Sequence, residues 1–76
     1  MKYKLGQRFK LWAHNFDYDT YILCRTGKNT LGLINLKTGV NWGHGVFYES
    51  ADNITEAHML ELCDESNWKE IFTLVE

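Results

Sequence analysis

The first fourteen residues alternate between apolar and polar side chains with a period of two. Odd positions from Tyr3 to Ala13 are mostly apolar, whereas even positions from Lys2 to His14 carry cations, a Trp and a His. Because successive side chains of a β-strand point to opposite faces, this pattern predicts a half-buried strand. We expect the strand to be interrupted near Gly6.

Three further strands are predicted, and each is bounded by turn residues. Tight turns are expected at TGKN and at KTGV, because Gly and Asn adopt the backbone conformations that such turns require. Two glycines in the last of these strands, Gly43 and Gly45, predict a β-bulge or a sharp bend. The expected strands span residues 20–25, 30–36 and 40–49.

The periodicity becomes helical in ADNITEAHMLELC. Thr55 is expected to cap a short helix with its hydroxyl, and Ile54 is expected to pack onto Met59 across the first turn. At helical spacing, Met59 shares one face with Leu60 and Cys63. The polar run DESN then ends the helix.

The last nine residues, WKEIFTLVE, are rich in β-branched and aromatic side chains and predict a closing strand. The chain 1–76 is therefore expected to form a single, mainly β domain with one short helix. About five antiparallel strands of these lengths fit either an SH3-like small barrel or a strongly bent antiparallel sheet. A core this small supplies only about 3–5 kcal/mol, so we expect a homo-oligomer or a binding partner.

The composition indicates a cytoplasmic protein. No apolar run approaches the roughly 18–20 residues of a membrane span, and the first residues lack the apolar core of a signal peptide. Two cysteines, Cys24 and Cys63, are fewer than a secreted domain of this size usually carries. We expect them to be free thiols.

Charge is distributed unevenly along the chain, although the net charge is only −2. Residues 1–38 hold seven basic and two acidic side chains, a net +5, whereas residues 39–76 hold one basic and eight acidic side chains, a net −7. This polarity fits an anionic ligand on the basic side or head-to-tail contact between copies. It fits equally well two halves that neutralise each other within the fold.

The sequence contains no catalytic or metal-binding motif. The histidines and cysteines occur singly, without the close pairs that hold structural zinc, and no serine lies in a nucleophile-elbow motif. Both cysteines lie in apolar patterns typical of packed thiols. Asp17 and Asp19 are two residues apart in a predicted turn and have no recognisable third group. We therefore expect no enzymatic activity, no metal and no cofactor.

The even-numbered face of the first strand carries the strongest indication of function. Cations neutralise phosphate and Trp rings stack on bases, so this face fits a nucleotide or a single-stranded nucleic acid. A solvated strand face is the alternative. The glycines around His44 either present backbone N–H groups to an anion or only bend the strand. The candidate ligand-binding residues are Arg8, Lys10, Trp12, His14, Trp42, Gly43, His44 and Gly45.

Residues 21–42, YILCRTGKNTLGLINLKTGVNW, together with the later NIT of residues 53–55, resemble a pattern in small proteins of tailed phages and prophages. The resemblance covers about half of the chain and rests on hairpin residues. It implies a phage-encoded protein that acts inside a bacterium, often to neutralise host machinery or immunity. Some proteins of this sort trap signalling nucleotides at oligomer interfaces. The resemblance transfers no catalytic residue.

Three functions follow as hypotheses. The first is a non-enzymatic binding protein that neutralises a host defence factor by sequestering an anionic nucleotide-type signal in a homo-oligomer. The second is a protein–protein inhibitor that caps a host enzyme through the acidic helix and exposed aromatic side chains. The third is a single-stranded nucleic-acid binder, which the negative net charge disfavours.

Overall fold

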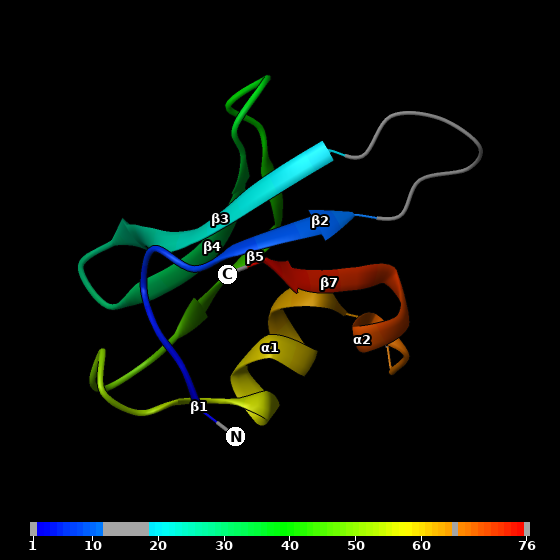
Figure 1. Cartoon of the computed structure of the whole chain (residues 1–76). Coiled ribbons are helices and arrows are strands. Elements are labelled where there is room, and N and C mark those ends of the chain that lie inside the picture. Colours follow the sequence, from blue (N-terminus) through cyan, green and yellow to red (C-terminus); the bar gives the residue numbers. More distant parts are fainter. Residues whose placement is uncertain (1, 12–18, 65, 76) are drawn as a thin grey trace.

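The structure is a computed structural model that describes residues 2–11, 19–64 and 66–75 (Figure 1). Trp12, His14 and the carboxylate of Asp17 lie outside the described residues. The described elements are β1 (Lys2–Tyr3), β2 (Arg8–Leu11), β3 (Asp19–Gly27), β4 (Thr30–Asn35), β5 (Asn41–Phe47), β6 (Ile54–Thr55), α1 (Glu56–Cys63), α2 (Trp68–Ile71) and β7 (Phe72–Val75).

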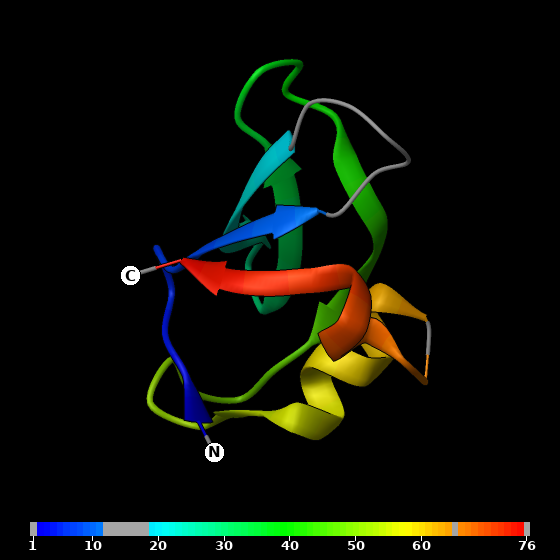
Figure 2. The ribbon, with the colours of Figure 1, turned by 45° about the vertical axis from the view of Figure 1, so that its right-hand side comes forward.

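Five strands form one antiparallel sheet in the order β5-β4-β3-β2-β7, and β1 pairs with β6 in a small second sheet. The mainly β class predicted from the sequence is confirmed. Within the described residues β5 and β7 are not paired with each other, so the sheet stays open and does not close into a barrel. Figures 1 and 2 show both helices on the same side of this sheet.

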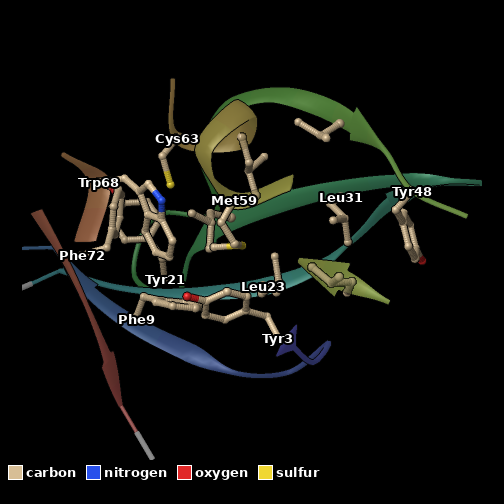
Figure 3. Close-up of a cluster of buried hydrophobic side chains, with 14 residues drawn as sticks. Tyr3, Phe9, Tyr21, Leu23, Leu31, Tyr48, Met59, Cys63, Trp68 and Phe72 are labelled. Carbon is tan, nitrogen blue, oxygen red and sulfur yellow. The ribbon is translucent and has the colours of Figure 1, made fainter. Parts of the chain in front are cut away.

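The core lies between the five-stranded sheet and the helices, and aromatic rings dominate it (Figure 3). Two groups of three rings pack at edge-on or tilted angles, a geometry that places the positive edge of one ring against the negative face of another. Ring centroids lie 5.7–6.4 Å apart in the first group and 5.3–5.9 Å apart in the second. The first group is Tyr3, Phe9 and Trp68, and the second is Tyr21, Trp42 and Phe72.

The strand β5 contains the bulge predicted from Gly43 and Gly45. The pairs on either side of it are Leu33 with Trp42 and Leu31 with Val46. Between these two pairs the chain advances by two residues on β4 and by four on β5. The two additional residues of β5 therefore lie in the segment that contains Gly43 and Gly45. A Cβ on Gly45 would lie 3.3 Å from the Cβ of Thr30, a tight contact that a small residue avoids.

Helix α1 begins after Thr55, as predicted. The backbone N–H of Thr55 donates a hydrogen bond to Nδ1 of His58 over 3.0 Å, so the third helical residue closes the first turn. Ile54 and Met59 are both fully buried, in agreement with packing across that turn. The expected helix face is wrong at one position. Leu60 is exposed, and Leu62 takes its place in the core.

The first four residues of the predicted closing strand form the short helix α2 instead. The N–H of Phe72 donates to the carbonyl of Trp68, which places these two side chains on one side of a helical turn. Both side chains are buried there. Trp68, Ile71 and Phe72 are apolar and are spaced as i, i+3 and i+4, which is the spacing of one helix face. The many β-branched and aromatic residues of this segment favoured the prediction of a strand instead. Only residues 72–75 continue as the strand β7.

Asn35 organises the turn between β4 and β5. Its buried side-chain Oδ1 accepts hydrogen bonds from the N–H groups of Lys37 (2.8 Å) and Thr38 (3.1 Å). Its backbone N–H donates to the carbonyl of Val40 over 2.9 Å. Gly39 completes the turn with a φ of +77°, a conformation that glycine adopts without steric cost. The LINLKTG motif therefore has a local structural role.

Asn35→Ala is expected to lower the free energy of unfolding by about 1–3 kcal/mol, because two N–H groups of the turn lose their acceptor. Asn35→Asp keeps the acceptor oxygens and is the matched control, with a smaller expected loss. Urea denaturation followed by circular dichroism measures both variants. Equal losses in the two variants would show that the hydrogen bonds to Oδ1 do not stabilise the turn.

Candidate anion-binding surface

One row of side chains crosses all five strands of the main sheet on the face opposite the core. Residues paired directly across antiparallel strands point to the same face. The neighbouring row contains the buried residues Phe9 and Tyr21, so this row faces outward. The row, which we call the outer row, is Val75, Arg8, Ile22, Ile34 and Asn41.

Lys10 lies on the same face as Arg8. It pairs with Thr20 on β3 and with Thr73 on β7, directly beside the outer row. Arg8 and Lys10 are both exposed. The outer row and the row of Lys10 contain these two cations and no carboxylate among their described residues.

A pocket of about 390 Å³ lies beside Arg8 at the start of β2. The N–H of Gln7 donates to the carbonyl of Lys4 over 3.2 Å, and the N–H of Lys4 donates to Oε1 of Gln7 over 2.9 Å. Gly6, with a φ of +93°, allows this tight turn, which brings Lys4 into the same pocket as Arg8. The lining of this cationic pocket is Lys4, Leu5, Gly6, Gln7, Arg8, Leu74 and Val75.

Trp42 lies on the opposite face of the sheet from Arg8. It is partly buried against the core, and its ring packs nearly perpendicular to those of Tyr21 and Phe72. Its indole N–H donates to the carbonyl of Cys63 over 3.4 Å. This corrects the expectation that Trp42 is displayed on the cationic surface. The strand parity that directs Leu33 inward also directs its partner Trp42 inward.

Of the other predicted site residues, Trp12 and His14 lie outside the described part of the chain, and the remaining three belong to β5. Gly43 and His44 lie in the bulge of β5, at the edge of the sheet. Gly45 does not have the positive φ of a left-handed residue, which an anion-holding nest of backbone N–H groups uses. The structure therefore brings together Arg8 and Lys10 from the predicted set and adds Lys4. Lys4 stands at an even position of the predicted first strand, as Arg8 and Lys10 do, so the alternating pattern could have identified it as a candidate.

Both cysteines are free; Cys63 is buried, whereas Cys24 is half-buried. Burial raises the pKa of Cys63 to about 12 and also raises the pKa of Cys24. A raised pKa leaves little of the reactive thiolate at neutral pH. In the described part of the chain, no group of three or more His, Cys, Asp or Glu side chains is placed to hold a metal ion. No helix there has the length and apolar character to cross a membrane.

Known proteins give no independent assignment for this surface. Neither a family model, nor a curated protein, nor a solved structure matches the chain. The resemblance to phage and prophage proteins stays a prediction. Asn35 is one of the residues on which this resemblance rests. It organises the turn between β4 and β5 and does not line the cationic pocket.

Proposed function

We propose that this chain is a non-enzymatic binding protein that holds an anionic ligand of nucleotide type at the cationic pocket. The observation that carries the proposal is the presence of Lys4 and Arg8 in one pocket whose described lining has no carboxylate. The guanidinium of Arg8 offers paired N–H donors that match two phosphate oxygens, and the ammonium of Lys4 adds a second positive charge.

Apolar neighbours strengthen this interaction. Val75 and Ile22 flank Arg8 in the outer row, and both are half-buried. Their side chains lower the local dielectric constant, so the attraction between Arg8 and a phosphate is stronger than it would be in open water. They also offer apolar surface to the uncharged part of a ligand.

The pocket lining supports binding without chemistry. Among the seven described residues that line it there is no His, Cys, Ser, Asp or Glu, and Lys4 is the one side chain there of a type that can transfer a proton or act as a nucleophile. In the phage setting that the sequence suggests, such binding would withdraw a signalling nucleotide from a host defence system. A homo-oligomer that covers the open sheet face would shield the captured ligand from water.

Arg8→Glu is expected to weaken binding of ATP, used as the probe, at least tenfold in isothermal titration calorimetry. Lys37→Glu makes the same charge change on the exposed β4–β5 turn, away from the pocket, and is expected to leave the affinity within twofold. Nucleotide recovered after heat denaturation is expected to be intact. Equal weakening by both variants would indicate non-specific attraction, and recovery of ADP would indicate an enzyme.

One observation favours the protein–protein inhibitor as the second candidate. Leu60 is 45% exposed on α1 and lines a pocket of about 440 Å³ together with Glu56 and Glu70. Glu56 is paired with Lys69 in the same lining, so Glu70, beside the apolar Leu60, is the carboxylate that would meet a basic protein surface. Native mass spectrometry of freshly purified protein distinguishes the candidates. A retained nucleotide supports the first, and a stoichiometric protein partner with no nucleotide supports the second.

A further inference from the structure

The turn between β4 and β5 displays two apolar side chains to solvent. Leu36 is 52% exposed and Val40 is 63% exposed. The backbone that carries them is fixed by hydrogen bonds. The N–H of Gly39 donates to the carbonyl of Asn35 over 2.8 Å, and the N–H of Val40 donates to Oγ1 of Thr38 over 3.2 Å. Such a turn needs little further ordering when another surface covers its side chains, so it is well suited to binding. We call residues 36–40 the apolar tip.

The apolar tip lies away from both helices. Figures 1 and 2 show the β4–β5 turn projecting from one end of the sheet, whereas α1 and α2 lie toward the other end. In the described part of the chain, no residue of the tip lines the cationic pocket or the pocket beside Leu60. The tip can therefore contact another molecule without uncovering either pocket.

The pocket beside Leu60, of about 440 Å³, lies between α1 and α2. Leu60 and Ala57 are exposed and three residues apart on α1, so they are neighbours on one face of the helix and form an apolar wall. The carboxylate of Glu56 is compensated by its ion pair with Lys69, whereas Glu70 has no ion pair among the described residues. The described lining of this interhelical pocket therefore combines an apolar wall with a net negative charge.

The apolar tip and the interhelical pocket are complementary in charge as well as in apolar character. Lys37 in the tip is exposed and has no ion pair among the described residues. This cation beside exposed apolar side chains matches the carboxylate of Glu70 beside Leu60. Contact between two copies would also bury further apolar surface, which stabilises a chain with so small a core.

We infer that the apolar tip of one copy docks into the interhelical pocket of a second copy. Leu36 and Val40 cover the apolar wall around Leu60. The ammonium of Lys37 lies close to the carboxylate of Glu70. This contact goes beyond the proposed anion binding and does not depend on it, because neither surface includes a described residue of the cationic pocket.

The contact joins two different surfaces of the chain and is therefore heterologous. After one contact has formed, one copy still offers its tip and the other still offers its pocket. Further copies can therefore add head to tail, either as an open chain or until a ring closes. The tip is a single turn, and a contact this small gives a weak association that depends on concentration.

Sedimentation velocity of the full chain, over a concentration series without added nucleotide, tests this contact. The mean sedimentation coefficient of the unsubstituted chain is expected to rise with concentration. Val40→Asp in the tip and Leu60→Asp in the pocket each place a carboxylate in the apolar contact, so each variant is expected to remain monomeric. Phe47→Asp adds the same charge at an exposed position of β5 outside both surfaces and is expected to associate as the unsubstituted chain does.

A mixture of two variants tests the head-to-tail arrangement. Val40→Asp retains an intact pocket and Leu60→Asp retains an intact tip, so together they are expected to form a one-to-one heterodimer and nothing larger. Circular dichroism verifies that each variant is folded, and Leu36→Asp takes the place of Val40→Asp should the latter fail to fold.

Charge reversal tests the ion pair between the copies. Lys37→Glu and Glu70→Lys are each expected to weaken the association several-fold, because each brings like charges together. The double variant Lys37→Glu/Glu70→Lys is expected to recover part of this loss, since opposite charges meet again with their positions exchanged.

Three results would overturn the inference: a chain that stays monomeric at every concentration, an equal loss of association in Phe47→Asp, or a mixture that forms no heterodimer. Retention of a host protein by a monomeric chain, lost in Leu60→Asp, would overturn it in favour of the protein–protein inhibitor. None of these variants alters a described residue of the cationic pocket, so the affinity for ATP tests the proposed function separately.

Discussion

Phe9→Ala is expected to lower the free energy of unfolding by about 3–5 kcal/mol. The side chain of Phe9 is 1% exposed, and its ring centroid lies 6.0 Å from that of Tyr3 and 6.4 Å from that of Trp68. It therefore joins the sheet to β1 and to α2 (Figure 3). A loss of this size is comparable to the whole stability expected of so small a core, and the variant should be largely unfolded at 37 °C.

Phe47→Ala is the matched control for this prediction. It removes the same atoms from a side chain that is 63% exposed on β5, so the expected loss is below about 0.5 kcal/mol. Urea denaturation at 25 °C, followed by circular dichroism, compares the two variants. Similar losses at both positions would contradict the core position assigned to Phe9.

Gly32→Ala is expected to lower the free energy of unfolding by about 1 kcal/mol, because the added methyl group forces the side chains of Thr26 and Asn41 to move. A Cβ at this position of β4 would overlap Cγ2 of Thr26 and lie 2.8 Å from Oδ1 of Asn41. These two side chains close over Gly32 from the neighbouring strands β3 and β5. The backbone of Gly32 is not strained, so crowding alone sets the cost.

The substitution Thr26→Ser tests whether contact with the Thr26 side chain causes the loss of stability in Gly32→Ala. Serine lacks Cγ2 but keeps the hydroxyl, which lies 3.1 Å from the hydroxyl of Thr30. The double variant Gly32→Ala/Thr26→Ser is expected to recover at least half of the lost stability. Gly39→Ala is the control. Gly39 has a φ of +77° and open space around its Cα, so the stability lost in this variant arises from backbone strain. Thr26→Ser is therefore expected not to restore the stability of Gly39→Ala. Absence of rescue at Gly32 would exclude crowding as the cause.

Local patterns predicted most of the sheet. The alternation of apolar and polar residues, together with the turn residues, predicted the positions of β2, β3 and β4 to within a few residues. This pattern is present because each of these strands has one face in the core. The glycines of β5 predicted its bulge, and at Gly45 the strand passes close to Thr30. Thr55 located the start of α1, because caps depend on a few adjacent residues.

Features that depend on distant contacts were missed. The residues Trp68–Ile71 form a helical turn because it buries Trp68 against Tyr3 and Phe9, and nothing local reveals those partners. The inward position of Trp42 follows from its pairing with Leu33, which is a property of the assembled sheet.

The bulge in β5 has a consequence for the behaviour of this protein in crowded solution. The strand β5 is an edge strand of the open sheet. Unpaired main-chain N–H and C=O groups at such an edge can pair with a strand of another molecule and so start fibril formation. The irregular spacing between Trp42 and Val46 denies an incoming strand a continuous ladder. The opposite border, β7, is only four residues long. An unclosed sheet can therefore persist without recruiting its neighbours into amyloid.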